Sequence, residues 1–466
     1  MATHSQSQVQ ELQAAALEHL WVYLREPSEM AEKGEPQIFV QGKGCRVTDA
    51  LGNSYIDAMS GLWLKNVGYG RTEIADAAYQ QMLQLTYMPM GTTTEPAVRL
   101  AQKIAQITPG DLSRCFFTSG GSESVETAMK VARAYFKRVG EPLRTKFISR
   151  KGSYHGATFG ALALGGSPVF PKSDYEPLLA GCFHGPQPNP YRCEYGGRTP
   201  EECAELCARA IEDIIKFQGP STVAAVVAEP VSSPLGAVVP GPNYWPMLRE
   251  ICDRYGCLLI ADEVITGFGR TGKMFACEHW GITPDIMTVA KGITSGYIPM
   301  GGAIVRKPIA DTFVGGPAAA FRHVITFGGH PVAAAASLKN IEIMEREGLV
   351  ENSARMGRYL LDGLEELKHK HQIIGDVRGL GLMCGVELVR DRHTREYFPE
   401  EADLAARLTQ GFANHGVLLR GGNTMNIMPP LCVTSAEVHE IVAVLDRVIG
   451  ETARQLGMAR ERLPAD

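Results

Sequence analysis

The sequence contains no long uninterrupted apolar segment. No stretch of its 466 residues approaches the roughly 18 apolar residues that a membrane-spanning helix needs. The first residues, Met1–Gln13, are polar. We therefore expect a protein that works in the cytoplasm and has no membrane partner.

An excess of charge of one sign is also missing. The formal net charge is −5, and acidic and basic residues are mixed along the chain. Such a surface creates no extended positive field, so the sequence predicts no nucleic-acid partner. Any anion must bind at a site that is built locally.

The cysteines show no disulfide framework, because their number, 11, is odd and they are widely spread. One stretch gathers possible zinc ligands, namely Cys182, His184, Cys193, Cys203 and Cys207. This stretch contains no Cys-x-x-Cys pair. Cys203 and Cys207 fall one turn apart on an amphipathic helix that we expect to begin near Thr199. We interpret the set as packing residues and predict no bound metal, with a metal site as the less favoured alternative.

The length exceeds what one compact core usually holds, so we expect two domains. Between Leu112 and about Ile304, short apolar runs bounded by turns alternate with helical patterns such as Glu123–Val139. This order is typical of an α/β domain around a mostly parallel sheet. The expected buried strands are Lys146–Ser149, Val223–Ala228, Leu258–Ala261 and Ile286–Ala290.

The two ends of the chain have a different pattern. From about Ala333, long helices alternate with strands such as Leu382–Leu388, which indicates a smaller α+β domain. The first 60 residues, with a helix over Val9–Leu24, are too few for a core of their own. We expect them to pack on the C-terminal domain or on a partner subunit. The predicted divisions are 1–66, 67–332 and 333–466.

A lysine that ends an apolar strand is the clearest candidate for chemistry. Lys291 follows the run Asp285–Ala290. Burial disfavours the charged form of a lysine, lowers its pKa and leaves a free amine that can act as a nucleophile. Taken alone the signal is weak, because a lysine at the end of a strand is more often a solvated terminus.

Two acids, Asp262 and Glu263, end the apolar strand that begins at Leu258. Neighbouring strand residues point to opposite faces, so only one of the two can face a ligand. Ligands of parallel sheets bind beyond the carboxyl ends of the strands, where Asp262 and Lys291 would both lie. A carboxylate there can hold a protonated pyridine nitrogen, which makes a pyridoxal ring a good electron sink.

Two glycine-rich segments are candidate phosphate sites. Thr118–Glu123 (TSGGSE) lies between a strand and a helix, where free backbone N–H groups attract anions. The alternative is that Ser122 is an ordinary helix N-cap. Gly267–Lys273 (GFGRTGK) satisfies most of a P-loop, but Met274 follows where magnesium binding requires Ser or Thr. We therefore do not expect a nucleotide hydrolase.

These segments together resemble the class III aminotransferases of fold type I, which include ω-amino acid, amine:pyruvate, ornithine and 4-aminobutyrate aminotransferases. The resemblance spans nearly the whole chain. It implies a large domain with a mostly parallel central sheet and a smaller α+β domain made from both chain ends. The segments that carry it are Ser119–Ala128, Tyr154–Gly156, Glu229-Pro230, Asp262–Gly272, Ala290–Gly292 and Thr326–Pro331.

The resemblance implies pyridoxal 5′-phosphate as the cofactor. Lys291 would carry it and move the proton, and Asp262 would pair with its ring nitrogen. The site would be shared across a homodimer, with a tetramer as the alternative assembly, and the partner subunit's Thr326 would reach the phosphate. The other implied cofactor-binding residues are Gly121 and Ser122 at the phosphate, Tyr154 and Val264 on the two ring faces, and His155 and Glu229.

The implied reaction moves an amino group from an amine or ω-amino acid donor to a keto acid. Arg420 resembles the arginine that grips the acceptor carboxylate, and Trp63, Met90 and Tyr154 resemble pocket walls, so we favour pyruvate as the acceptor. A surface ion pair for Arg420 and core packing for Trp63 and Met90 remain the alternatives. The same scaffold also serves aminomutases and decarboxylating aminotransferases. A non-catalytic binding protein is disfavoured by the intact Lys291 and Asp262.

Overall fold

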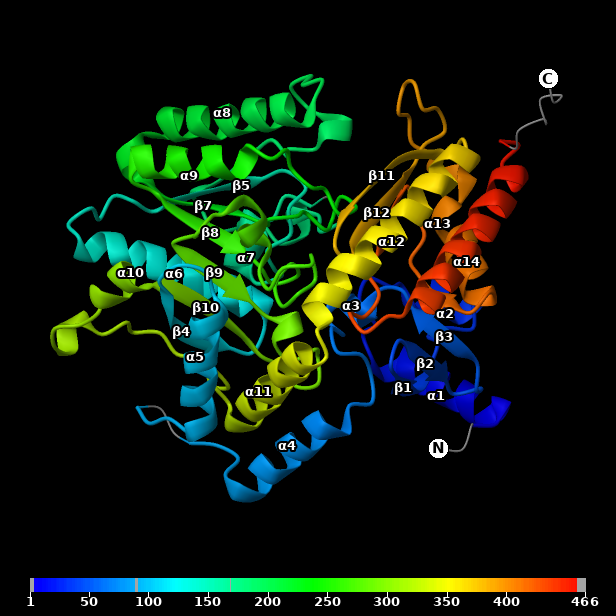
Figure 1. Ribbon diagram of the computed structural model, residues 1–466, viewed down its shortest axis with the longest axis horizontal. Coiled ribbons are helices and arrows are strands. Elements are labelled where there is room, and N and C mark those ends of the chain that lie inside the picture. The colour runs from blue at the N-terminus through cyan, green and yellow to red at the C-terminus, as the bar shows by residue number, and fades with distance from the viewer. Residues whose placement is uncertain (1–3, 89–90, 168, 459–466) are drawn as a thin grey trace.

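The computed structural model describes residues 4–88, 91–167 and 169–458 and has two lobes (Figure 1). The larger lobe is built on a seven-stranded sheet. β10 is antiparallel to both of its neighbours, and every other pairing is parallel. The strand order is β4 (Leu112–Thr118), β10 (Gly301–Arg306), β9 (Ile286–Val289), β8 (Leu258–Asp262), β7 (Val223–Ala228), β5 (Lys146–Arg150) and β6 (Cys182–Gly185). This confirms the predicted mostly parallel α/β fold.

The central strands are buried on both faces, which explains their continuous apolar runs. Along β7, Ala225 and Val227 pack in the core beside α6, whereas Val226 and Ala228 pack in the core beside α8 and α9. The helices of this lobe are α4 (Thr72–Gln84), α5 (Glu95–Ile107), α6 (Gly121–Arg138), α7 (Phe159–Leu164), α8 (Pro200–Gln218), α9 (Tyr244–Tyr255), α10 (Lys307–Asp311) and α11 (Pro331–Arg346).

The smaller lobe contains the first and the last of the described residues, which lie on the same side of the molecule in Figure 1. β3 (Ser54–Asp57) pairs in parallel with β13 (Val417–Leu418), so the first residues add strands to the C-terminal lobe as expected. The remaining strands are β1 (Phe39–Lys43), β2 (Arg46–Asp49), β11 (Ile374–Leu380), β12 (Met383–Leu388) and β14 (Thr424–Ile427). The helices are α1 (Gln6–His19), α2 (Pro27–Glu32), α3 (Ser60–Trp63), α12 (Leu349–Lys370), α13 (Leu404–Asn414) and α14 (Ser435–Gln455).

Two details differ from the sequence prediction. The first helix ends at His19 and not at Leu24, and Trp21 beyond it is 89% exposed. The predicted domain boundary after residue 332 falls within the first turn of α11, a helix that packs on α4 and α5 of the larger lobe. The domain boundaries themselves stay predictions. No helix in the described part of the chain is long and apolar enough to span a membrane.

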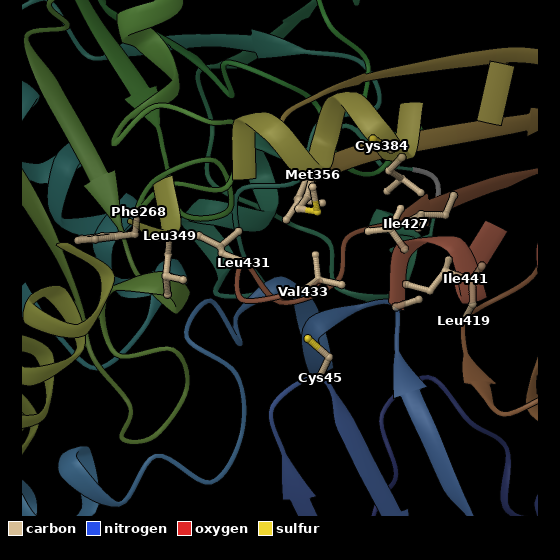
Figure 2. Packing of buried hydrophobic residues seen from close by; sticks show 14 of the residues in the cluster. Cys45, Phe268, Leu349, Met356, Cys384, Leu419, Ile427, Leu431, Val433 and Ile441 are labelled. Carbon is tan, nitrogen blue, oxygen red and sulfur yellow. The ribbon is translucent and has the colours of Figure 1, made fainter. Parts of the chain in front are cut away.

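The lobes meet at a continuous apolar core. Figure 2 shows buried side chains from distant parts of the chain in this core, including Cys45, Phe268, Leu349 and Leu431. Because these side chains come from both lobes, their packing in one core stabilises the position of each lobe relative to the other.

A fully buried arginine, Arg270, reinforces the junction between the lobes. Its guanidinium donates to the carbonyl oxygens of Pro429 (2.6 Å) and Leu382 (3.3 Å). It also donates to Asn66 Oδ1 (3.0 Å) and Ser60 Oγ (3.2 Å). The P-loop-like glycine run thus places the Arg270 guanidinium among oxygen atoms from residues 60–66, 382 and 429.

Candidate active site

The carboxyl ends of the central strands open into a cavity of about 140 Å³, where α/β sheets bind their ligands. The loops after β4, β5, β7, β8 and β9 all contribute to its lining. The structure brings together eight of the residues that the sequence singled out, namely Gly121, Ser122, Tyr154, His155, Glu229, Asp262, Val264 and Lys291.

Lys291 lies just beyond β9, at the start of a short 3-10 turn that ends at Ile293. Its φ of +46° is in the left-handed region, which is uncommon for a residue with a side chain. The Nζ atom is 5.1 Å from the centre of the Trp63 ring. Burial lowers the pKa of Lys291 to about 8, against a smaller opposing effect of Asp262. Much more of this amine is therefore uncharged near neutral pH than in an ordinary lysine.

Asp262 is the last residue of β8 and is 4% exposed. Its Oδ2 lies 2.7 Å from His155 Nδ1. Its Oδ1 accepts hydrogen bonds from the Thr288 hydroxyl (2.9 Å) and the Val264 N–H (3.2 Å). These partners fix the carboxylate at the cavity.

Glu263 is fully buried and points away from the cavity. Its carboxylate accepts the backbone N–H groups of Cys277 (2.8 Å) and Ala276 (3.0 Å). Burial raises the pKa of Glu263. As expected for neighbouring strand residues, only one of the two acids faces the site.

The first turn of α6 also lines the cavity. Gly121 and Ser122 are the first two residues of this helix, and Gly120 is its N-cap, so the alternative role of Ser122 as N-cap is wrong. Gly156 has a φ of +138°, and a Cβ there would lie 2.6 Å from Ser122 Oγ. A Cβ on Gly121 would lie 3.0 Å from Val264. Glycine at both positions keeps space beside N–H groups that attract an anion.

A buried ion pair supports Tyr154 and was not anticipated from the sequence. Arg150 Nη2 lies 2.9 Å from Glu229 Oε2, with side-chain exposures of 1% and 8%. Glu229 Oε1 in turn accepts the Tyr154 N–H at 3.2 Å. The available signal was an arginine directly after the predicted strand Lys146–Ser149, in the same kind of position as Lys291.

We expect Glu229→Gln to lower the free energy of unfolding by about 3 kcal/mol, because it leaves the Arg150 charge buried without its counter-ion. Denaturant unfolding of the purified protein measures this loss. The matched control is Glu194→Gln, whose partner Lys151 is solvent-exposed and where we expect a loss of about 1 kcal/mol or less. Equal losses in the two variants would mean that the buried pair is not a structural support.

Three of the remaining predicted residues, Trp63, Thr326 and Arg420, are not part of the cavity lining. Trp63 is next to Lys291, and its buried indole N–H has no partner among the described residues. Thr326 is exposed, and its carbonyl oxygen accepts the Tyr87 hydroxyl at 2.8 Å. Arg420 is exposed just after β13. Met90 lies outside the described residues.

Known proteins resemble this chain over most of its length. Residues 30–449 match the aminotransferase class-III family. A probable aminotransferase of Mycobacterium tuberculosis is 44% identical, over 90% of both chains. The taurine–pyruvate aminotransferase of Bilophila wadsworthia is 39% identical, over 96% of this chain and 99% of its own.

Solved structures are similarly close. An (S)-enantioselective omega-transaminase from Thermomicrobium roseum superposes with a TM-score of 0.92 at 39% identity, over 97% of this chain and all of its own. An amine transaminase of an uncultivated Pseudomonas species, solved in its PLP-bound form, has a TM-score of 0.90 at 37% identity, over 93% of this chain and 99% of its own. The chain therefore belongs to the class III aminotransferases.

Proposed function

We propose that this aminotransferase holds pyridoxal 5′-phosphate in the cavity and moves an amino group from an amine or ω-amino acid to pyruvate. The observation that carries the proposal is the presence of Lys291, with its lowered pKa, and the anchored carboxylate of Asp262 in the lining of one cavity. The PLP-bound relative and the pyruvate-dependent relative both support it.

The residues present fit this cofactor. The glycines at 121 and 156 leave room beside the first turn of α6 for a phosphate. Asp262 supplies a negative charge for a ring nitrogen, and Tyr154 and Val264 line the space between them. When bound, the cofactor supplies an electron sink for the carbon that loses its proton.

The chain itself contributes binding, orientation and proton transfer. The Lys291 amine serves first as the tether and then, once displaced, as the base that takes the proton from the donor carbon. Its lowered pKa means that a free electron pair is available without a strongly alkaline solution. Asp262, held by His155 and Thr288, keeps a positive charge favourable at the ring nitrogen.

We further propose that the active unit is a homodimer with shared sites. Thr326 is exposed and does not belong to the lining of the cavity in its own chain. Its neighbours Phe327 and Val324 are 61% and 59% exposed, and Tyr87, which contacts Thr326, is 44% exposed. A second copy covering this region would bury these side chains and bring the partner subunit's Thr326 toward a phosphate.

Alanine formation from pyruvate tests the proposed activity. The protein loaded with pyridoxal phosphate should convert pyruvate to alanine with at least one donor among taurine, putrescine, β-alanine, 4-aminobutyrate and a simple 1-arylalkyl amine. Release of carbon dioxide with the product would favour the decarboxylating alternative, and rearrangement of the donor without alanine would favour an aminomutase.

We expect Arg420→Ala to reduce kcat/KM for pyruvate about 10- to 100-fold more than for an uncharged aldehyde acceptor, because only pyruvate has a carboxylate to bind. The control is Arg358→Ala, an exposed arginine on α12 that lies outside the cavity lining. Equal losses for both acceptors would show that Arg420 does not bind the carboxylate of pyruvate.

A further inference from the structure

Three cysteines from two segments meet between β6 and α8. The Sγ atoms of Cys193, Cys203 and Cys207 all lie within 4.8 Å of one another. Cys203 and Cys207 are one turn apart on α8 and fully buried, whereas Cys193 is half-buried and directly follows a 3-10 turn, Pro190–Arg192. The other two members of the sequence cluster are not part of the group. Instead, His184 Nε2 lies 3.0 Å from the Leu164 carbonyl oxygen.

We propose that these three thiols form a binding site for a soft cation with a filled d shell, such as Zn²⁺, with the fourth position open to water beside Cys193. Zinc–thiolate bonds of about 2.3 Å place ligand sulfurs about 3.8–4.0 Å apart, so the sulfurs need to move by only about 1 Å. The helix holds two ligands in fixed positions, and the loop can adjust the third.

The chemistry of the cluster suits such a cation. Thiolates are the ligands that select zinc and other soft cations over magnesium or calcium. Binding forms three sulfur–metal bonds and releases up to three protons to solvent.

The position of the site indicates what a bound cation would do. The segment 186–198 reaches across to the smaller lobe, where Arg192 pairs with the buried Glu387 of β12 and donates to the Arg395 carbonyl oxygen at 2.6 Å. At its start, Gln187 Nε2 donates to Ser232 Oγ (3.1 Å), beside the cavity loop. A cation that fastens Cys193 to α8 would therefore anchor a segment that contacts both the cavity loop and the other lobe.

Cadmium titration of the reduced, metal-free, full-length protein tests the site. Cd²⁺ gives an ultraviolet thiolate charge-transfer band, and we expect one tightly bound Cd²⁺ per chain, displaced by excess Zn²⁺. Cys193→Ser should lose this tight binding, and the rise in Tm that Zn²⁺ produces should be lost with it. Two control variants should keep both responses: Cys182→Ser, which alters a cysteine outside the cluster, and Cys432→Ser, which breaks a pair of thiols 3.8 Å apart.

Aminotransferase activity in metal-free buffer checks that the Cys193→Ser variant is folded, because Cys193 takes no part in the cavity. Equal Cd²⁺ uptake by wild type and Cys193→Ser would overturn the proposal. So would a failure of the wild-type protein to take up Cd²⁺ after reduction, whether or not it was isolated with a Cys193–Cys203 disulfide.

Discussion

Replacing Lys291 with alanine should reduce kcat for alanine formation about 10⁴-fold or more, because the same amine is the tether and the proton carrier. Borohydride reduction provides a second readout. In the wild-type protein it should fix the cofactor to the peptide that contains residue 291, whereas the variant should acquire no fixed cofactor there. Mass spectrometry of the digested protein measures this difference.

Lys65→Ala is the matched control for this experiment. Burial lowers the pKa of Lys65 to about 8 as well, but its Nζ lies over the Tyr297 ring at 4.3 Å and it is not in the cavity lining. We expect Lys65→Ala to retain activity within about 10-fold of wild type. Borohydride labelling at Lys65, or residual activity of Lys291→Ala within 10-fold of wild type, would contradict the assigned role.

Asp262→Asn should reduce kcat about 10²- to 10³-fold while cofactor binding persists, because the substitution removes the charge and leaves the phosphate cradle intact. It should also change the pH dependence. Asp262 raises the pKa of Lys291, so its neutralisation lowers that pKa further below about 8. The basic form of the displaced lysine then persists to lower pH, so the part of the kcat profile that rises with pH should shift to lower pH.

Thr288→Val separates this charge effect from loss of a single contact. It removes one hydrogen bond to Asp262 Oδ1 and leaves the carboxylate in place. We expect a loss of about 10-fold, since one hydrogen bond to a charged group contributes about 1.5 kcal/mol. If Asp262→Asn and Thr288→Val were equally mild, the carboxylate would not hold the ring nitrogen.

The strands that carry the site were predictable because they are buried on both faces. Val223–Ala228 forms β7 with the predicted bounds. Lys291 and Asp262 could be singled out because each stands at the carboxyl end of such an apolar run. The end of the first helix was not predictable in the same way. Apolar residues continue the helical pattern past His19, but nothing in the local sequence shows that Trp21 stays exposed.

The buried ion pair behind Tyr154 was missed because it depends on a partner that is distant in the sequence. Arg150 ends β5, Glu229 follows the neighbouring strand β7, and the two are 79 residues apart. The cysteine cluster was visible as a group, but the sequence did not show that only Cys193, Cys203 and Cys207 of it come together. Local patterns therefore predicted which residues could carry chemistry better than they predicted which residues hold them in place.

The central position of Arg270 has a consequence for how the protein melts. Its acceptors belong to residues 60–66, 382 and 429. Any separation of the lobes would therefore break the hydrogen bonds that compensate for the burial of this cation. The lobes therefore cannot behave as independently stable units, and loss of one removes the support of the other. We expect heating to produce a single cooperative transition in which the first sixty-odd residues and the last hundred or so are released together.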